Sequence, residues 1–383
     1  MKRRFIAFAA LTVLAVGALA GSGCVGAGAK APAEIKIGVI APLTGNIASF
    51  GQSTKNGLDL LVKDVNSKGG ILGKQVRLIY EDDRNDPVET ANATRKLITQ
   101  DKVVAIIGSV TSKCTLAGAP IAQSSGVPML SPTSTNENVT KVGDFISRAC
   151  FIDPFQGTVM AKFATETLKA KTAGVIFDIG NDYSKGLAEA FKLAFEQLGG
   201  QVVAWETYAE GDQVFSAQLT RVRSKQPDVL FQPDYYHAVT LISKQARQAG
   251  ITATFLGGDG WDAPETAAIG GAAVEGAFFA NHYSPDSTDP VAVAFISAYK
   301  AAYGSVPDAL AALAYDAGLV MFDAIKRAGS TDGKAIKDAV IATRNLRAVS
   351  GAINMNASRD PVKGAAIIKL VGGKQVFAGT VNP

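Results

Sequence analysis

The amino-acid sequence predicts an α/β protein built from two Rossmann-like lobes. Short β-rich segments alternate with amphipathic helical segments, which is typical of a parallel sheet covered by helices on both faces. This alternation starts again after residue 153, with a second series of similar size. The chain has 383 residues, and a single hydrophobic core stops growing at about 250–300 residues. Two cores are therefore expected.

The first series of elements begins at residue 34. Its first helix places Leu58, Leu61 and Val65 on one face, and its second has Pro87 in the first turn, where the missing N–H costs nothing. The predicted elements are strand 34–40, helix 52–66, strand 76–80, helix 87–100, strand 103–107, helix 113–123 and strand 128–130.

The second series repeats the pattern. It consists of helix 155–169, strand 173–177, helix 184–198, strand 201–205, helix 213–224, strand 228–231, helix 237–249 and strand 253–256. The C-terminal part supplies helices 289–303, 308–327 and 331–342, followed by strands near 364–370 and 375–380. Strands that alternate with helices of this length indicate parallel sheets.

The N-terminal segment predicts export. Residues 1–20 have a basic start, an apolar run at 5–16 and a small-residue cleavage site ending at Ala20, the layout of a secretory signal peptide. Cys24 follows in a sequence similar to a bacterial lipobox, with Gly21 where that motif prefers Leu. Lipidation of Cys24 and simple release after Ala20 both stay open. Residues 21–33, rich in Gly and Ala, are expected to form a flexible tether.

Composition excludes two classes of partner. The formal net charge is +4, and three of these charges lie before residue 21, so a chain that starts at Gly21 is near +1. Such a chain lacks the concentrated basic face that nucleic acid requires. With only His237, His282 and two cysteines (Cys114 and Cys150) after the tether, the usual metal-ligand spacings are absent. We expect no cofactor.

Hydroxyl groups follow two neighbouring strands of the first series. Ser109 and Ser112 come after strand 103–107, and Ser131-Pro-Thr-Ser-Thr-Asn136 comes after strand 128–130. Open α/β sheets bind ligands at the carboxyl ends of their strands. Single hydroxyls there usually cap helices, but two clusters together offer hydroxyl and backbone N–H donors around one point. These donors suit a carboxylate.

Acidic and aromatic residues follow the strands of the second series. Tyr183 comes after strand 173–177, Tyr235 after strand 228–231, and Asp259 lies in the Gly257-Gly-Asp-Gly260 stretch after strand 253–256. Aromatic rings with a carboxylate suit a cation, although Asp259 could serve only as a turn or cap residue. Donors from one lobe and acceptors from the other predict a zwitterionic ligand between them.

With these features, the chain resembles the leucine/isoleucine/valine-type substrate-binding proteins of ABC transporters. The resemblance covers residues 34–380 and rests on the order and spacing of several motifs. These are Ala41-Pro-Leu-Thr-Gly45, Ser67-Lys-Gly-Gly-Ile-Leu-Gly73, Glu81-Asp-Asp83, Ile107-Gly-Ser109, Ser131-Pro132 and Phe151-Ile-Asp-Pro-Phe-Gln-Gly157.

The resemblance implies two Rossmann-like lobes joined by three crossovers and closing on ligand like a hinged clamp. The expected division is 34–152 and 284–350 for lobe 1, and 153–283 and 351–383 for lobe 2. It also implies a monomeric, non-enzymatic receptor, periplasmic or lipid-anchored outside a bacterial membrane. Such a receptor captures a free aliphatic α-amino acid and delivers it to an ABC permease.

The resemblance also implies roles for individual residues. Ser112 would bind the ligand carboxylate through its hydroxyl, Asp259 would bind the ammonium, and Phe50, which replaces a frequent Tyr, would form an apolar wall. The full set of implied ligand-binding residues is Phe50, Ser112, Thr133, Ser134, Thr135, Tyr183, Tyr235 and Asp259.

Three further expectations accompany this interpretation. Cys114 and Cys150 form a disulfide in an oxidising compartment, or else remain two separately buried thiols. The rival function is an enzyme with Ser112 or Cys114 as nucleophile, which would need an oriented base within reach. Another alternative is a sensory domain with the same clamp; because the sequence has no apolar stretch of spanning length after the signal, signalling would need a separate partner.

Overall fold

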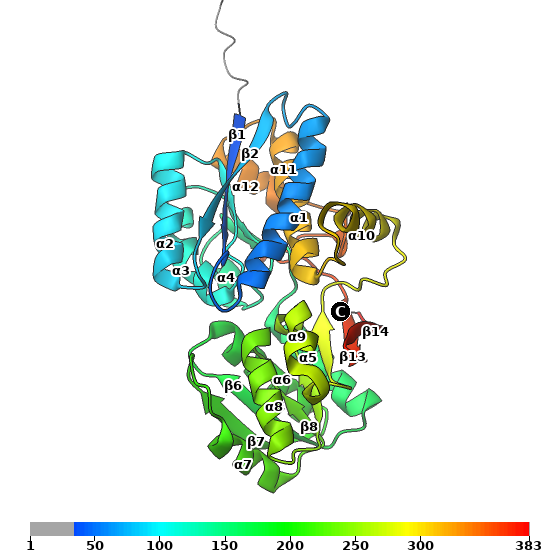
Figure 1. Ribbon diagram of the computed structural model, residues 1–383. Coiled ribbons are helices and arrows are strands. Elements are labelled where there is room, and N and C mark those ends of the chain that lie inside the picture. The colour runs from blue at the N-terminus through cyan, green and yellow to red at the C-terminus, as the bar shows by residue number, and fades with distance from the viewer. Residues whose placement is uncertain (1–33, 383) are drawn as a thin grey trace, which may run out of the picture. The chain divides into compact units, whose positions relative to one another are not determined.

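Two sheets, each covered by helices on both faces, organise residues 34–382, the part of the chain that the computed structural model describes (Figure 1). The predicted signal peptide at 1–20, the tether at 21–33 and the lipidation candidate Cys24 lie outside the described residues. Both sheets are built mainly from parallel strands that alternate with helices. The predicted fold class is therefore confirmed.

The first sheet has five parallel strands in the order β2–β1–β3–β4–β5. They are β1 (Glu34–Ala41), β2 (Gln75–Asp82), β3 (Ala105–Ile107), β4 (Met129–Ser131) and β5 (Ile146–Arg148). Alternate residues of a strand point to opposite faces, so Ile107 and Ile106 enter two different hydrophobic clusters. Burial on both faces explains why these strands are apolar throughout.

Helices from distant parts of the chain cover this first sheet. On one face α1 (Ala48–Ser67) packs against α11 (Ala309–Ala328), and on the other α2 (Pro87–Lys96) packs against α3 (Ser112–Ser124) (Figure 1). The remaining elements are α4 (Asn138–Lys141), α10 (Pro290–Tyr303), α12 (Gly333–Ile341), a π-helical turn at Leu97–Asp101 and the hairpin β11 (Leu346–Ala348) and β12 (Gly351–Ile353).

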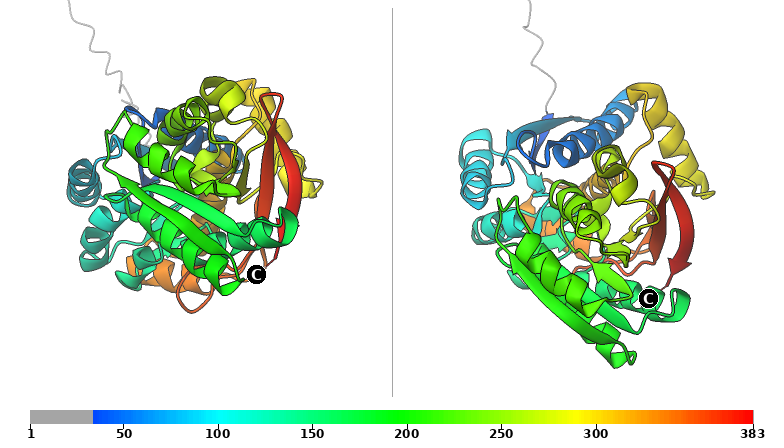
Figure 2. Two further views of the ribbon diagram at one scale, coloured as in Figure 1. Left: turned by 90° about the horizontal axis from the view of Figure 1, so that it is seen from below. Right: turned by 60° about the horizontal axis from the view of Figure 1, so that its bottom comes forward.

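The second sheet has seven strands in the order β14–β13–β10–β9–β8–β6–β7. They are β6 (Thr172–Asp178), β7 (Gln201–Tyr208), β8 (Val229–Phe231), β9 (Thr254–Gly257), β10 (Phe278–Asn281), β13 (Ala365–Val371) and β14 (Lys374–Val381). The strands from β7 to β10 are parallel, whereas β13 and β14 form an antiparallel hairpin at the edge, drawn in red in Figure 2.

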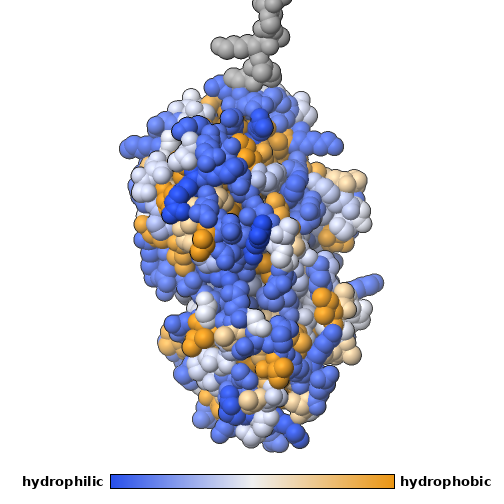
Figure 3. Space-filling view, turned by 60° about the vertical axis from the view of Figure 1, so that its left-hand side comes forward, coloured by the Kyte–Doolittle hydropathy of each residue, from blue (hydrophilic) through white to orange (hydrophobic). Residues whose placement is uncertain are grey.

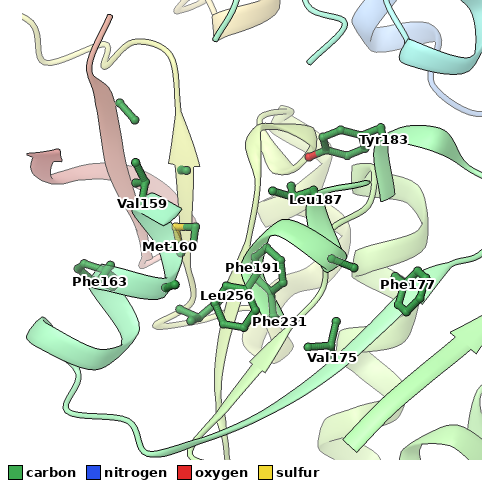
Figure 4. Close-up of a cluster of buried hydrophobic side chains, with 14 of the residues drawn as sticks. Val159, Met160, Phe163, Val175, Phe177, Tyr183, Leu187, Phe191, Phe231 and Leu256 are labelled. Carbon is green, nitrogen blue, oxygen red and sulfur yellow. The ribbon is translucent and has the colours of Figure 1, made fainter. Parts of the chain in front are cut away.

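Two hydrophobic clusters cover the faces of the second sheet. One includes Val175, Leu187, Phe191 and Phe231, and Figure 4 shows these side chains converging between the sheet and the helices α5 and α6. The other lies against α7 and α8 and contains the fully buried Trp261. The helices of this lobe are α5 (Asp153–Lys162), α6 (Asp182–Gln197), α7 (Ser216–Lys225), α8 (Tyr236–Gln248) and α9 (Pro264–Gly270), with a π-helical turn at Phe163–Thr167 and 3-10 turns η3 (Asp259–Trp261) and η4 (Gly271–Ala273).

The chain crosses between the lobes three times, as expected. The crossings are residues 149–152 between β5 and α5, 282–289 between β10 and α10, and 354–364 between β12 and β13. The predicted boundary between residues 350 and 351 falls inside the β11–β12 hairpin. Because Ala348 pairs with Gly351 there, residues 351–353 stay with lobe 1, and the third crossing begins after them.

The predicted disulfide between Cys114 and Cys150 is wrong for this structure, in which both residues are buried free thiols. Cys114 lies in the first turn of α3, and its Sγ is 3.7 Å from Asn85 Oδ1. Cys150 lies in the first crossing. Burial raises the pKa of both thiols to about 12. The alternative of two separately buried thiols therefore holds.

The surface of the described residues is largely polar. Figure 3 shows one face, on which hydrophilic residues predominate and apolar residues occur in small groups. Among residues 34–382, no helix has both the length and the apolar character needed to cross a membrane.

Candidate functional site

A small cavity lies between the strand ends of the two lobes. Residues that directly follow β3, β4, β6, β8, β9 and β10 contribute to its lining, so the carboxyl ends of both sheets meet there. The lining residues are Phe50, Val110, Thr111, Ser112, Thr133, Tyr183, Tyr235, Asp259, Gly260, His282, Ala309, Leu310 and Leu313.

Lobe 1 presents hydrogen-bond donors to the cavity. Ser112 is the first residue of α3, where the N–H groups of the first turn have no partner within the helix. Its Oγ accepts a hydrogen bond from Asn136 N at 3.2 Å, which leaves the Ser112 hydroxyl hydrogen free to donate. Thr133 fixes the neighbouring loop, because its Oγ1 donates to Val110 O at 2.7 Å. This wall suits an anionic group.

Ser134 and Thr135 do not line the cavity, although the sequence placed them in the site. The hydroxyls of Ser134 and Thr115 lie 2.7 Å apart, and Ser134 N donates to Ser131 Oγ at 3.0 Å. Thr135 O accepts from Asp153 N at 2.9 Å, whereas its buried Oγ1 has no hydrogen-bond partner among the described residues. Both residues thus lie behind the wall. The other six predicted residues line the cavity together.

Two tyrosines form the wall that lobe 2 contributes. Tyr183 lies in the first turn of α6 and Tyr235 immediately precedes α8, and both are buried. Phe50, from α1 of the other lobe, meets the ring of Tyr235 edge-on with centroids 5.8 Å apart. The aromatic wall is therefore made jointly by both lobes.

Asp259 supplies the carboxylate of the cavity. It begins the 3-10 turn η3 after β9, and its Oδ2 lies 2.8 Å from His282 Nε2. Its Oδ1 is buried with no hydrogen-bond partner among residues 34–382. Burial works to raise the pKa of Asp259, but the hydrogen bond from His282, with the nearby polar groups of Gln156 and Tyr183, holds it below the usual value. Asp259 is therefore ionised at neutral pH and has one oxygen left for a ligand cation.

Apolar side chains close the remaining part of the cavity. Phe50 and Val110 contribute from lobe 1, and Leu310 and Leu313 come from the first turns of α11. Sequence reasoning missed both leucines, since nothing in a helix so distant along the chain indicates its contact with β3. It also missed His282 as a site residue, because β10, the strand it follows, was not predicted.

Within residues 34–382, neither candidate nucleophile, Ser112 or Cys114, is hydrogen-bonded to a histidine. Burial raises the pKa of the Cys114 thiol to about 12, which keeps it protonated. Ser112 Oγ hydrogen-bonds a backbone amide, and the imidazole in the cavity, His282, is paired with Asp259. A nucleophile needs an oriented base within hydrogen-bond reach, and no such pair is formed by these residues.

These features define a class: a two-lobed α/β protein with a cavity between its lobes that is lined by hydrogen-bond donors, a carboxylate and apolar side chains. The family model described as periplasmic binding protein matches residues 34–374. The chain belongs to this family of substrate-binding proteins, which are not enzymes.

Named relatives and solved structures agree with this assignment. A Leu/Ile/Val-binding protein homolog of Brucella melitensis is 37% identical over 314 residues, which cover 81% of this chain and 84% of that one. The structure of the leucine binding protein LivK from Thermotoga maritima matches with a TM-score of 0.88 and 45% identity, covering 91% of this chain and 99% of that one. LivJ from Streptococcus pneumoniae, solved in complex with isoleucine, matches with a TM-score of 0.87 and 34% identity, covering 91% of this chain and all (100%) of that one.

Proposed function

We propose that this protein is an extracytoplasmic receptor that captures an aliphatic α-amino acid between its lobes and delivers it to an ABC permease. The observation that carries the proposal is the distribution of groups around one cavity. Donors at Ser112 and the start of α3, the carboxylate of Asp259 and the apolar residues Phe50 and Leu310 all line it. These three kinds of group complement the carboxylate, ammonium and side chain of such a ligand.

The ligand's charged groups would each meet a suitable partner. Its carboxylate would accept hydrogen bonds from Ser112 and from first-turn N–H groups of α3. Its ammonium would pair with Asp259 Oδ1, the oxygen that His282 leaves free. Tyr183 and Tyr235 would cover the ligand from the second lobe.

Side-chain selectivity would come from the apolar end of the cavity. Phe50, Val110, Leu310 and Leu313 offer no charged partner to a ligand side chain, so an aliphatic one is favoured over an acidic one. Discrimination within the aliphatic set should be modest, since one methylene in an apolar pocket is worth about 1–3 kcal/mol. The names of the Brucella and Thermotoga relatives and the isoleucine bound in LivJ support this ligand class.

Capture would proceed by hinge closure. Contacts between the lobes already join the two halves of the site: Lys113 Nζ lies 2.6 Å from Glu210 Oε1, and Asn136 Nδ2 donates to Asp182 O at 2.7 Å. A ligand that touches both lobes favours the closed arrangement by its differential contacts. We expect the receptor to act as a monomer. Outside the membrane, it would be either released by cleavage after Ala20 or anchored by a lipid on Cys24.

Calorimetric titration tests the proposal directly. L-leucine, L-isoleucine and L-valine should each bind at one site per chain and be recovered unchanged. L-glutamate and glucose serve as controls and should bind far more weakly. Tight binding of glutamate without binding of leucine, valine or alanine would contradict the proposed ligand class, and turnover of any amino acid would contradict the receptor role.

A further inference from the structure

His282 lies at the junction of the ligand cavity and the segments that cross between the lobes. It is the first residue of the second crossing and is almost fully buried. Its ring stacks on Phe151 of the first crossing, with centroids 3.6 Å apart and an interplanar angle of 27°. Two crossing segments therefore fix where the imidazole nitrogens lie.

The hydrogen bond between His282 and Asp259 has a defined direction. A carboxylate can only accept, so the hydrogen must lie on His282 Nε2, which is 2.8 Å from Asp259 Oδ2. His282 Nδ1 has no hydrogen-bond partner among the described residues, which fits a ring that carries one hydrogen. Burial lowers the pKa of His282 to about 4 despite the neighbouring carboxylate, so the ring is neutral near pH 7.

The neutral ring has a consequence for ligand binding. A protonated imidazole would neutralise Asp259 and repel a ligand ammonium, whereas a neutral donor leaves the full negative charge on Asp259. The bond engages only Oδ2 and fixes the carboxylate so that Oδ1, which has no partner among residues 34–382, stays available. Without this donor, Asp259 could rotate, and Oδ2 would be left buried and unpaired.

We infer that His282 is a positioning residue, which acts through its Nε2–H donor to hold Asp259 Oδ1 toward the ligand ammonium. The inference rests on the proposed function, since it requires an ammonium-bearing ligand. The second crossing thereby gains a role in ligand binding. The packing of Phe151 against the imidazole would not by itself require this role.

Two substitutions separate the donor from the ring. His282→Gln keeps an N–H donor at a reach similar to Nε2 but loses the ring that stacks on Phe151. His282→Phe keeps an aromatic ring on Phe151 but loses the donor. A positioning role and a merely structural role therefore predict opposite orders of affinity for these two variants.

The experiment is calorimetric titration of L-leucine into the wild-type protein and both variants, with thermal melts of the unliganded proteins. We expect His282→Gln to bind within about threefold of wild type and His282→Phe to bind about 10- to 100-fold more weakly, as loss of a hydrogen bond to a buried charge implies. Equal affinities for the two variants, or weaker binding by His282→Gln than by His282→Phe, would overturn the inference.

Asp259→Asn distinguishes this failure from a failure of the proposed function. If Asp259→Asn binds leucine like wild type, the ammonium site itself is wrong. If it binds weakly while His282→Phe binds like wild type, only the positioning role is wrong.

A measurement on the wild type covers the case in which His282→Phe does not fold. The chain has two histidines, so ¹⁵N-histidine labelling with His237→Gln as the assignment control gives a simple spectrum. The leucine-bound protein should show His282 as the neutral tautomer with hydrogen on Nε2. Hydrogen on Nδ1 alone, or a doubly protonated ring near pH 7, would contradict the inference.

Discussion

The rings of Tyr183 and Tyr235 stack in parallel beside the cavity, with centroids 5.1 Å apart and planes 5° apart. They come from different connections, after β6 and after β8, yet only one of the two hydroxyls is engaged. Tyr183 Oη accepts a hydrogen bond from Gly260 N at 3.0 Å. Tyr235 Oη is buried without a hydrogen-bond partner among the described residues.

This asymmetry predicts different outcomes for two matched substitutions. Tyr183→Phe leaves the buried N–H of Gly260 without an acceptor, so the free energy of unfolding should fall by about 1–3 kcal/mol. Tyr235→Phe removes a hydroxyl that bonds nothing in the described residues, so it should leave stability unchanged or raise it. Urea denaturation of the unliganded variants measures both values. Equal destabilisation by the two would contradict the assigned hydrogen bond.

The sequence predicted those cavity-lining residues that follow recognisable strands. Ser112, Tyr183, Tyr235 and Asp259 were found because their strands have clear apolar patterns and parallel strands end at a common edge. His282 was missed because β10 (Phe278–Asn281), the strand that it follows, was not recognised in the sequence.

Contacts between distant segments were beyond sequence reasoning. Leu310 and Leu313 reach the cavity only because α11 packs beside α1 on the first sheet. In contrast, Ser134 was placed in the site by family resemblance, mainly through its backbone groups, yet it does not line the cavity, and its hydroxyl lies against Thr115. Side-chain direction in an irregular loop has no period that a sequence pattern could reveal. The β11–β12 hairpin was also not predicted.

A buried ion pair should anchor the third crossing to lobe 1. Arg148 Nε lies 2.6 Å from Asp360 Oδ1, and the guanidinium also donates to Ser134 O at 2.6 Å. Asp360→Asn would leave a fully buried guanidinium without its counter-charge, so we expect a loss of about 3–5 kcal/mol in unfolding free energy. The control Asp64→Asn breaks the exposed pair with Lys68 and should cost less than about 0.5 kcal/mol. Similar effects in the two variants would count against this anchor.

The ion pair between Lys113 and Glu210 should affect ligand release. It joins the start of α3 to the loop after β7, and its Glu210 side chain is 62% exposed. The Lys113 side chain is only 10% exposed, but its partner Glu210 faces solvent. A pair with one exposed partner is worth about 1 kcal/mol, so Glu210→Gln should weaken leucine binding by about fivefold, mainly through faster release. Stopped-flow release rates at low salt should show the difference, and at about 1 M salt, where the screening length is about 3 Å, it should shrink. A salt-independent effect would point to another cause.

Because of Asp234, the stability of the folded protein should depend on pH in a specific way. Burial raises its pKa to about 7, although hydrogen bonds from the Tyr208 hydroxyl and Tyr235 N act in the opposite direction. The folded protein thus keeps a proton that the unfolded chain loses near the ordinary value of 3.8. The stability from this group is fully present below pH 3.8 and is lost as pH rises through about 7.

Asp234→Asn removes this titration and keeps an acceptor for Tyr208. The variant should therefore gain stability relative to wild type as pH rises from about 4 to 7, by about 4 kcal/mol at most, since one pKa unit corresponds to about 1.4 kcal/mol. Denaturation midpoints across this pH range measure the difference. A difference that does not vary with pH would show that Asp234 is ionised in the folded protein.

The charge of Asp259 gives the most direct test of the ligand's ammonium. Asp259→Asn preserves the size of the side chain and an acceptor for His282 but removes the negative charge from the cavity. If a ligand ammonium pairs with Oδ1 in this buried place, the loss should cost about 2–5 kcal/mol of binding energy, which lowers affinity by tens to thousands of times.

If Asp259 only begins the turn at Asp259–Trp261, the same change should reduce stability by about 1 kcal/mol and leave binding intact. Calorimetry with leucine and a thermal melt without ligand separate these outcomes, because only a role in the ligand site predicts the large loss of affinity. Because leucine, isoleucine and valine carry the same ammonium, the loss should appear for all three. Binding within a few-fold of wild type would remove Asp259 from the site, and with it the case for an α-amino ligand.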